Sequence, residues 1–296
     1  MDRRDFLQKG AMAVLAGCGM SAEALAASMA KKSNRIGIQL YSIREYLPKD
    51  FTGSLQKLAD IGYSHVEAYG VDGDKFLHKT LKETSAIVKD MGMKLTSTHC
   101  GTGLLPADTQ AKEWDYWRKT AQAMKEVGGK FLAQPWVPSM KTIDELKRSA
   151  EQFNKVGEIC KKNGLKFAFH NHDIEFKKFD GQGPVIEDFL LKNTDPELVF
   201  FQLDLGHVIN GGGDILDYMR KYPKRFLSWH ASDFKKGQGY IELGQGDVPW
   251  YDLFKIAKSY GLEDLTMEHE SGDDRFAIMK RNFDYLAQFP WTKVKK

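Results

Sequence analysis

Cysteine is scarce in this chain of 296 residues, which carries only Cys18, Cys100 and Cys160. Three cysteines are too few for a fold built on a framework of disulfides. Cys100 ends a predicted strand and Cys160 lies in a predicted helix, so no disulfide between them is implied. We expect both to be buried, unreactive thiols.

Long blocks of like charge and long apolar runs are also absent. The net charge is +3, and the basic residues alternate with acidic ones, which does not favour a nucleic-acid partner. No apolar run is long enough to span a bilayer. The length suits one barrel of about 250 residues or two small domains. No feature of the sequence predicts an oligomeric state.

Residues 1–30 have the features of an export signal. Arg3 and Arg4 resemble a twin-arginine motif, and a weakly apolar stretch follows over residues 11–17. The segment ending at Cys18 resembles the lipobox of bacterial lipoproteins, which would place a lipid on Cys18. Cleavage after Ala26 would instead release a soluble exported protein, and an ordinary amphipathic helix is the third alternative. We expect a periplasmic protein or a lipoprotein whose only membrane attachment is that lipid.

From residue 35 onward, short apolar segments alternate with amphipathic helical segments. The expected strands are 35–41, 65–69, 94–99, 131–134, 166–170, 199–204, 226–230 and 265–268. Such alternation predicts parallel strands joined by crossover helices, and eight units close most simply into an α/β fold, the (β/α)8 TIM barrel. Residues 31–296 are therefore expected to form a single domain.

Local signals support these boundaries. Thr142 and Glu145 are spaced as a capping box at a helix start. Glycines that suit the left-handed helix end follow the predicted helices, at Gly62, Gly92, Gly128, Gly164 and Gly261. An open doubly wound sheet would need a glycine-rich turn after the first strand, and residues 42–45 contain no glycine.

Four potential metal ligands lie at or next to the ends of four predicted strands. They are His170, Asp204, His230 and Glu268. A parallel barrel brings the carboxyl ends of its strands onto one face, where enzymes of this fold carry their active sites. Two imidazoles and two carboxylates predict one divalent metal, with Mn, Zn, Fe or Co favoured over Mg.

Three motifs give the chain a family resemblance. Asp204 is followed three residues later by His207, and His230 by Asp233, and a stretch from Leu243 to Trp250 carries two glycines. This combination resembles the xylose-isomerase-like sugar isomerases and epimerases, which are related to inosose dehydratase and to an AP endonuclease branch. The resemblance implies a TIM barrel with one divalent metal held by Glu, Asp, His and Glu.

The resemblance carries three ligands over directly and departs at the fourth. Asp204, His230 and Glu268 match, whereas His170 stands where many members have glutamate, before Asn171 and His172. In the epimerases two glutamates flank the substrate and move protons on its opposite faces. Here one of the two is missing, so elimination becomes as plausible as epimerisation.

The same comparison assigns further residues to the site. We expect Glu268 and one histidine, either His172 or His207, to divide the acid and base roles. Expected substrate contacts are Glu67, His99, Asn171, Trp136 and Asp233. Trp229 is expected to pack in the core.

The expected function is that of a divalent-metal-dependent sugar isomerase or epimerase. It would remove a proton alpha to a carbonyl group bound at the metal. Because sugar phosphates are cytoplasmic and the leader predicts export, we expect a non-phosphorylated sugar or keto-sugar. One alternative is a lyase or dehydratase acting on a keto-sugar, for example by elimination from a 3-keto-glycoside. A non-catalytic exported sugar-binding lipoprotein is another, and a nuclease would need several zinc ions and a basic groove.

Overall fold

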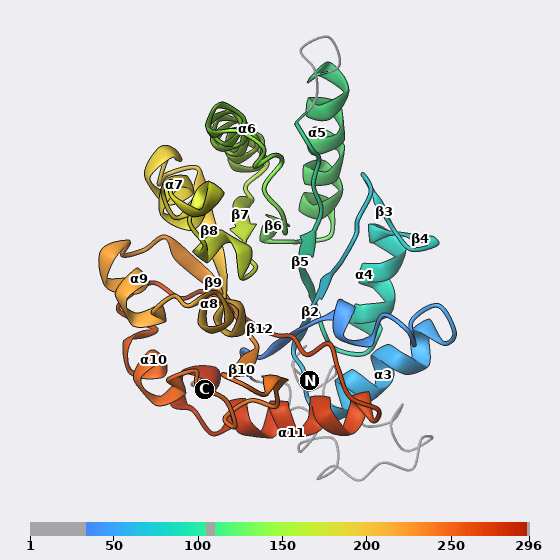
Figure 1. Ribbon diagram of the computed structural model, residues 1–296. Coiled ribbons are helices and arrows are strands. Elements are labelled where there is room, and N and C mark those ends of the chain that lie inside the picture. The colour runs from blue at the N-terminus through green and yellow to red at the C-terminus, as the bar shows by residue number, and fades with distance from the viewer. Residues whose placement is uncertain (1–33, 105–109, 295–296) are drawn as a thin grey trace, which may run out of the picture.

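A closed barrel of parallel strands forms the centre of the protein in the computed structural model, which describes residues 34–104 and 110–294 (Figure 1). The barrel strands are β1 (Gly37–Gln39), β2 (His65–Ala68), β5 (Leu95–His99), β6 (Phe131–Gln134), β7 (Lys166–His170), β8 (Val199–Asp204), β9 (Phe226–Ala231) and β12 (Asp264–Met267). Around the barrel they follow one another in chain order, and β12 pairs with β1 to close it. The predicted TIM barrel is confirmed.

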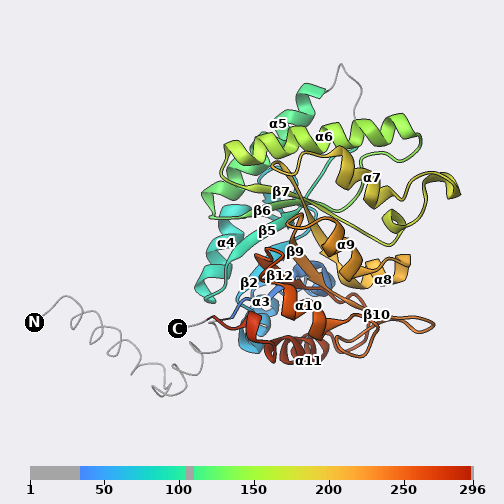
Figure 2. The ribbon, with the colours of Figure 1, turned by 90° about the vertical axis from the view of Figure 1, so that its left-hand side faces the viewer.

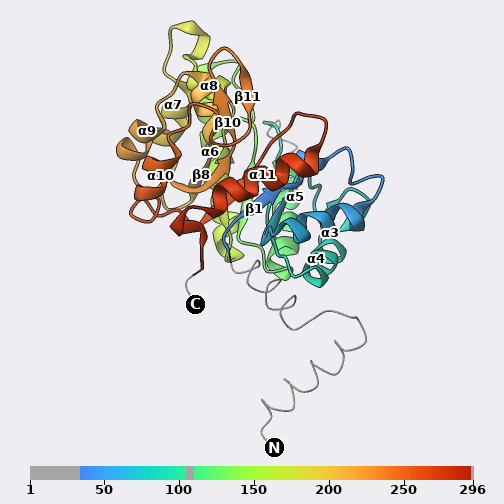
Figure 3. The ribbon, with the colours of Figure 1, turned by 90° about the horizontal axis from the view of Figure 1, so that it is seen from below.

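Helices follow the strands and surround the barrel (Figure 1). They are α3 (Phe51–Ile61), α4 (Leu81–Asp90), α5 (Gln110–Glu126), α6 (Ile143–Lys162), α7 (Ile186–Asn193), α8 (Leu205–Gly211), α9 (Ile215–Lys221), α10 (Trp250–Ile256) and α11 (Arg275–Ala287). Short 3-10 helices occur at η1 (Leu40–Ile43), η2 (Ile174–Phe176), η3 (Phe179–Gly181) and η4 (Pro290–Thr292). Figure 3 shows α11 lying beside α3, the first helix of the described residues, which completes the outer ring.

Several helix boundaries follow the local signals, although α10 ends at Ile256, five residues before Gly261. Gly92 and Gly164 adopt φ values of 72° and 75°, as the left-handed ends of α4 and α6 require. Thr142 caps α6 by accepting a hydrogen bond from the backbone N–H of Glu145. The side chain of Glu145 instead accepts a hydrogen bond from Ser139 Oγ at 2.6 Å, so only half of the predicted capping box forms.

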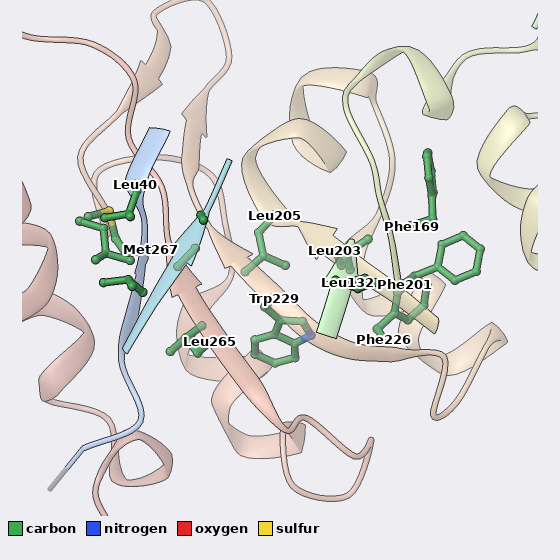
Figure 4. Packing of buried hydrophobic residues seen from close by; sticks show 14 of the residues in the cluster. Leu40, Leu132, Phe169, Phe201, Leu203, Leu205, Phe226, Trp229, Leu265 and Met267 are labelled. Atoms are coloured by element: carbon green, nitrogen blue, oxygen red, sulfur yellow. The ribbon is translucent and has the colours of Figure 1, made fainter. Parts of the chain in front are cut away.

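Apolar side chains fill the layer between the strands and the helices. Figure 4 shows Phe201, Leu203, Trp229 and Leu265 among them, and each is at most 1% exposed. Burying one such side chain contributes about 1.5–3 kcal/mol to folding. Successive strand residues point to opposite faces, so the alternate residues of these strands point into the barrel.

Two short hairpins extend loops that were not predicted to contain strands. They pair β3 (Lys75–Phe76) with β4 (Lys79–Thr80), and β10 (Asp233–Lys235) with β11 (Gly239–Ile241). The second hairpin follows β9 and projects beyond the strand ends (Figure 2). Cys100 and Cys160 are free and buried, as expected. Among the described residues, no helix combines the length and the apolar character needed to cross a membrane.

Candidate active site at the carboxyl ends of the strands

Side chains at the carboxyl ends of β7, β8, β9 and β12 converge on one point. His170, Asp204, His230 and Glu268 each place one potential ligand atom there, and these atoms lie within 4.8 Å of one another. None of the four residues is more than 7% exposed. The strand ends meet at one rim of the barrel, which is why residues from four separate segments come together.

A second group overlaps the first. His99, His170 and His230 also place potential ligand atoms within 4.8 Å of one another. The imidazole of His99 stacks on that of His230 at a centroid distance of 5.1 Å. The expected substrate residue His99 therefore borders the same centre as the four expected ligands.

The ring of His230 lies between two carboxylates. Its Nδ1 is 2.8 Å from Oε2 of Glu268, and its Nε2 is 2.6 Å from Oε1 of Glu67. When Nε2 donates its proton to Glu67, Nδ1 keeps a lone pair directed at the centre, which is how a carboxylate orients a histidine that binds a metal. The donor set thus fits a divalent ion.

Glu67 has no exposed surface and is charged despite its burial. Burial alone would raise its pKa, but the neighbouring imidazoles of His99 and His230 outweigh it and hold the pKa of Glu67 well below the usual range. Burial likewise would lower the pKa of His230, and Glu67 and Glu268 together raise it well above normal. The floor of the site is therefore strongly polarised.

Asp204 is held in place by its own segment. Its Oδ1 accepts hydrogen bonds from the backbone N–H of His207 at 2.8 Å and from Ser232 Oγ at 2.5 Å. The first of these bonds makes Asp204 the N-cap of α8. Oδ2 is the oxygen left for a ligand.

Gln202 connects several site residues and was not predicted. Its Oε1 lies 2.8 Å from Nε2 of His99 and 3.2 Å from Nδ1 of His170, while its Nε2 donates to Oε2 of Glu67 at 3.0 Å. The available signal is its position two residues before Asp204, because alternate residues of a strand share one face. A polar residue at that spacing in an apolar strand points into the barrel.

Two hollows open above this centre. The larger, of about 460 Å³, is lined by Tyr41, Tyr69, Gly70, His99, Pro135, Trp136, His170, His172, His207, Glu268 and Glu270. The smaller, of about 240 Å³, is lined by Asp204, His207, Ser232, Asp233, Tyr240, Glu268, His269, Glu270 and Ser271. Trp136, an expected substrate contact, is 42% exposed at the rim. Among the described residues, neither lining includes a lysine or an arginine.

His172 and His207, two expected acid–base residues, lie beside each other. Their ring centroids are 4.8 Å apart, and Nδ1 of His207 forms a hydrogen bond with the hydroxyl of Tyr240. Burial and the neighbouring His207 lower the pKa of His172. A neutral imidazole therefore borders the larger hollow at neutral pH. Tyr240, from the unpredicted hairpin, is an additional site residue.

Three expected substrate contacts form hydrogen bonds within the protein. The side chain of Asn171 accepts from the backbone N–H of Asp204 at 3.0 Å and donates to its carbonyl at 3.4 Å. Glu67 lies below the hollows and binds His230. Asp233 accepts five hydrogen bonds, four from backbone N–H groups and one from Trp250 Nε1 at 2.9 Å. These hydrogen bonds hold neighbouring groups in position, and Asp233 also lines the smaller hollow. Contact of the three residues with a substrate stays a prediction.

The chain matches the xylose isomerase-like TIM barrel family over residues 55–293. It belongs to this family. A sugar phosphate isomerase/epimerase from Parabacteroides distasonis is similar in structure, with 30% sequence identity and a TM-score of 0.79 over 88% of this chain and 96% of that protein.

Two inosose dehydratases are also similar to this chain in sequence. An inosose dehydratase from Clostridium perfringens is 26% identical over 157 residues, which cover 45% of this chain and 50% of the relative. The chain thus spans about half the length of that relative. The inosose dehydratase from Mesomycoplasma hyopneumoniae is 25% identical over 279 residues, which cover 80% of this chain and 87% of the relative.

Proposed function

We propose that this protein is a divalent-metal-dependent sugar isomerase or epimerase that transfers a proton at the carbon next to a carbonyl group. The observation that carries the proposal is the convergence of four buried ligand atoms below two hollows. Membership of the xylose isomerase-like family supports it. A metal with mixed nitrogen and oxygen ligands favours Mn, Zn, Fe or Co over Mg.

The expected ligands are His170, Asp204, His230 and Glu268. A divalent ion held there would supply Lewis acidity toward a carbonyl oxygen and so acidify the adjacent C–H bond. Glu67 fixes the orientation of His230, and Ser232 that of Asp204. These supports keep the ligand set in place without help from a substrate.

Proton transfer is assigned to residues that line both the centre and the hollows. Glu268 and His207 line both hollows, and His172 lines the larger one. His172, whose pKa is lowered by burial and by His207, is neutral at pH 7 and can accept a proton. The exposed face of Trp136 offers an apolar surface for a sugar ring.

The substrate is proposed to lack a phosphate group. Phosphate dianions are bound by arginine and lysine, and the described linings of both hollows contain neither. Arg44 near the rim lies 3.9 Å from a carboxylate oxygen of Glu270 and 3.8 Å from one of Glu45, so its charge is already balanced. A neutral sugar or keto-sugar fits these linings better than a sugar phosphate.

A lyase or dehydratase acting on a keto-sugar is the second candidate. It is favoured because His170 occupies the position at which the related epimerases carry one of the two glutamates that flank the substrate. With a 3-keto-glycoside, a base would take the proton from C2, the electron pair would form the C1–C2 double bond, and the aglycone would leave C1 with a proton. Similarity to inosose dehydratases supports this alternative.

The deciding experiment follows products by NMR in deuterated solvent with added Mn²⁺ and a panel of free, keto- and glycosidic sugars. Deuterium next to the carbonyl without bond cleavage indicates an isomerase or epimerase. Release of water or aglycone indicates the lyase. The variant Glu268→Gln, in the site, should lose the activity. Its matched control, Glu151→Gln on the exposed face of α6, should keep it. Sugar binding without exchange or cleavage would contradict both enzymes and indicate a binding protein.

A further inference from the structure

A third hollow lies at the other end of the barrel, where the strands begin. Its volume is about 570 Å³, and most of its lining residues lie just before the strands or at their first two positions. They are Asn34, Arg35, Ser64, His65, Gly92, Lys94, Thr96, Lys130, Glu263, Asp264 and Val294. We call it the amino-end hollow. No residue of the proposed active site contributes to it.

The basic side chains of the amino-end hollow are not neutralised by the described part of the chain. Lys94 and Lys130 are exposed and make no ion pair with any described residue. Arg35 lies over the ring of Trp291, at 5.3 Å from its centroid. The hollow therefore carries positive charge that is available to a ligand.

The two acidic residues of the lining are already occupied. Glu263 pairs with Lys166 at 2.5 Å. Asp264 accepts hydrogen bonds from Ser228 and Thr266, and its Oδ1 lies 3.0 Å from Nε2 of His65, a contact of ion-pair length that is not aligned as a hydrogen bond. The pair with Lys166 offsets the charge of Glu263, and the oxygens of Asp264 are taken up by the two hydroxyl groups and His65.

Two buried side-chain atoms of this lining, Thr96 Oγ1 and His65 Nε2, form no hydrogen bond with a described residue. Thr96 is 4% exposed, and its Oγ1 forms no hydrogen bond with a described residue. A buried hydroxyl without a partner is costly, so its presence in a lining that also carries three cations points to a ligand that accepts its proton.

The pocket wall is also shaped around His65. Its Nδ1 lies 2.9 Å from Ser64 Oγ, which orients the ring. The ring lies against Gly37, where an added Cβ would stand only 2.2 Å from Nε2. The glycine thus leaves room for the imidazole at this end of the barrel.

We propose that the amino-end hollow binds a phosphate group, with Lys94, Lys130 and Arg35 balancing its charge and the Thr96 hydroxyl donating a hydrogen bond. A dianion matches several clustered cations better than a single carboxylate does. The hollow is larger than a phosphate ion and has room for the rest of a small phosphorylated molecule. This site is independent of the proposed active site.

The first test measures inorganic phosphate binding by calorimetry with the full chain after treatment with a chelator. The double variant Lys94→Gln/Lys130→Gln should bind phosphate about tenfold more weakly or worse. The matched control Lys82→Gln/Lys125→Gln removes the same charge from exposed helix positions outside the hollow and should bind as the parent does. Equal binding by all three proteins would overturn the proposal.

The second test uses Thr96→Val, which has nearly the same shape and lacks the hydroxyl. We expect weaker phosphate binding together with unchanged or higher resistance to urea, because a buried group without a partner is removed. Thr96→Ser, which keeps a hydroxyl, should retain binding. Full phosphate affinity in a folded Thr96→Val protein would show that Thr96 does not contact the ligand and would contradict the assignment.

A third arm distinguishes a free phosphate from the phosphate of a lipid headgroup. The parent and the Lys94→Gln/Lys130→Gln protein are sedimented with vesicles of phosphatidylglycerol or phosphatidylcholine. If the double variant loses binding to phosphatidylglycerol vesicles and its behaviour with phosphatidylcholine vesicles is unchanged, the phosphate belongs to a lipid headgroup. Binding of inorganic phosphate with no such difference between vesicles identifies a soluble phosphate compound.

Discussion

Glu67 illustrates how one buried carboxylate organises the site. It accepts the Nε2 proton of His230 at 2.6 Å and a hydrogen bond from Gln39 at 2.8 Å. We predict that Glu67→Gln lowers the affinity for Mn²⁺ about tenfold to a hundredfold, because a neutral acceptor orients and polarises the imidazole less strongly. Calorimetric titration with Mn²⁺ measures the change.

The matched control for this variant is Glu113→Gln. Glu113 is also a buried glutamate, at 3% exposure, but it accepts a hydrogen bond from Thr102 away from the site. It should bind Mn²⁺ as the parent does. If both variants keep the parental affinity, Glu67 does not act through His230 on a metal.

His170 tests the departure from the family's glutamate. We predict that His170→Glu retains a metal but shifts preference toward harder ions such as Mg²⁺, because an anionic oxygen replaces an imidazole. Competition between Mg²⁺ and Zn²⁺ measures the shift. Elimination should slow more than proton exchange, since the added negative charge weakens the Lewis acid. A variant that matches the parent in metal preference and products would exclude His170 as a ligand.

At the scale of elements, Asp233 holds the long loop between β9 and α10. Its two oxygens accept from the backbone N–H groups of Phe234, Gly244, Gly246 and Val248 and from the Trp250 indole. We predict that Asp233→Ala lowers the free energy of unfolding by about 3–5 kcal/mol, because several donors lose their partner at once. Urea denaturation measures it.

A comparison variant for Asp233→Ala is Asp252→Ala on α10. The Asp252 carboxylate makes an exposed pair with Lys255 at 2.9 Å. Exposed pairs contribute little, so its loss should change the unfolding free energy by less than about 0.5 kcal/mol. A similar small change for Asp233→Ala would show that the loop is held by other contacts.

Helix α7 contains a carboxyl group that is unfavourably placed at neutral pH. Glu187 is fully buried, and neither of its side-chain oxygens has a hydrogen-bond partner among the described residues. Burial, together with the charges of Glu175 and Asp188, raises the pKa of Glu187 well above the usual range. Its contribution to stability is therefore present below the unfolded-state pKa of about 4.3 and is lost as the pH rises toward its folded-state pKa.

We predict that Glu187→Gln removes this pH dependence. The variant should gain stability relative to the parent as the pH rises above about 4.3, reaching about 1–3 kcal/mol in the neutral range. Urea denaturation at several pH values between 4 and 8 (about one unit apart) measures the difference. Glu151→Gln on the exposed face of α6 should show none. A constant difference across the pH range would mean that Glu187 ionises normally in the folded protein.

At the scale of the whole molecule, we propose that the protein is exported. The motifs that predict export lie in residues 1–30, outside the described residues. Changing Arg3 and Arg4 together to lysine should leave the protein in the cytoplasm, and Cys18→Ala should abolish fatty-acid labelling while the barrel still folds. Cell fractionation and labelling with a fatty acid measure the two effects. If the paired-lysine variant is distributed as the parent is, the export proposal is wrong.

Several boundaries of the barrel could be predicted because their signals are local. The predicted bounds of β6, β7 and β8 match the structure at both ends, and each of these strands carries its own apolar segment. The glycines after α4 and α6 were recognisable because a left-handed conformation favours glycine whatever the rest of the chain does. The hairpin of β10 and β11 was missed because its residues are mostly polar and carry no apolar alternation.

The sequence by itself determined the alternation of strands and helices, and with it the barrel and the rim at which four candidate ligands meet. Only the tertiary structure decided which polar atoms pair. Glu67 contacts His230 across 163 positions of the chain and Gln202 across 135 positions. Periodicity along the chain sets the face on which a side chain lies, whereas hydrogen bonds depend on distances of a few ångströms between strands. Those distances exist only once the barrel has closed, and they bring Glu67 to His230 and Asn171 to Asp204.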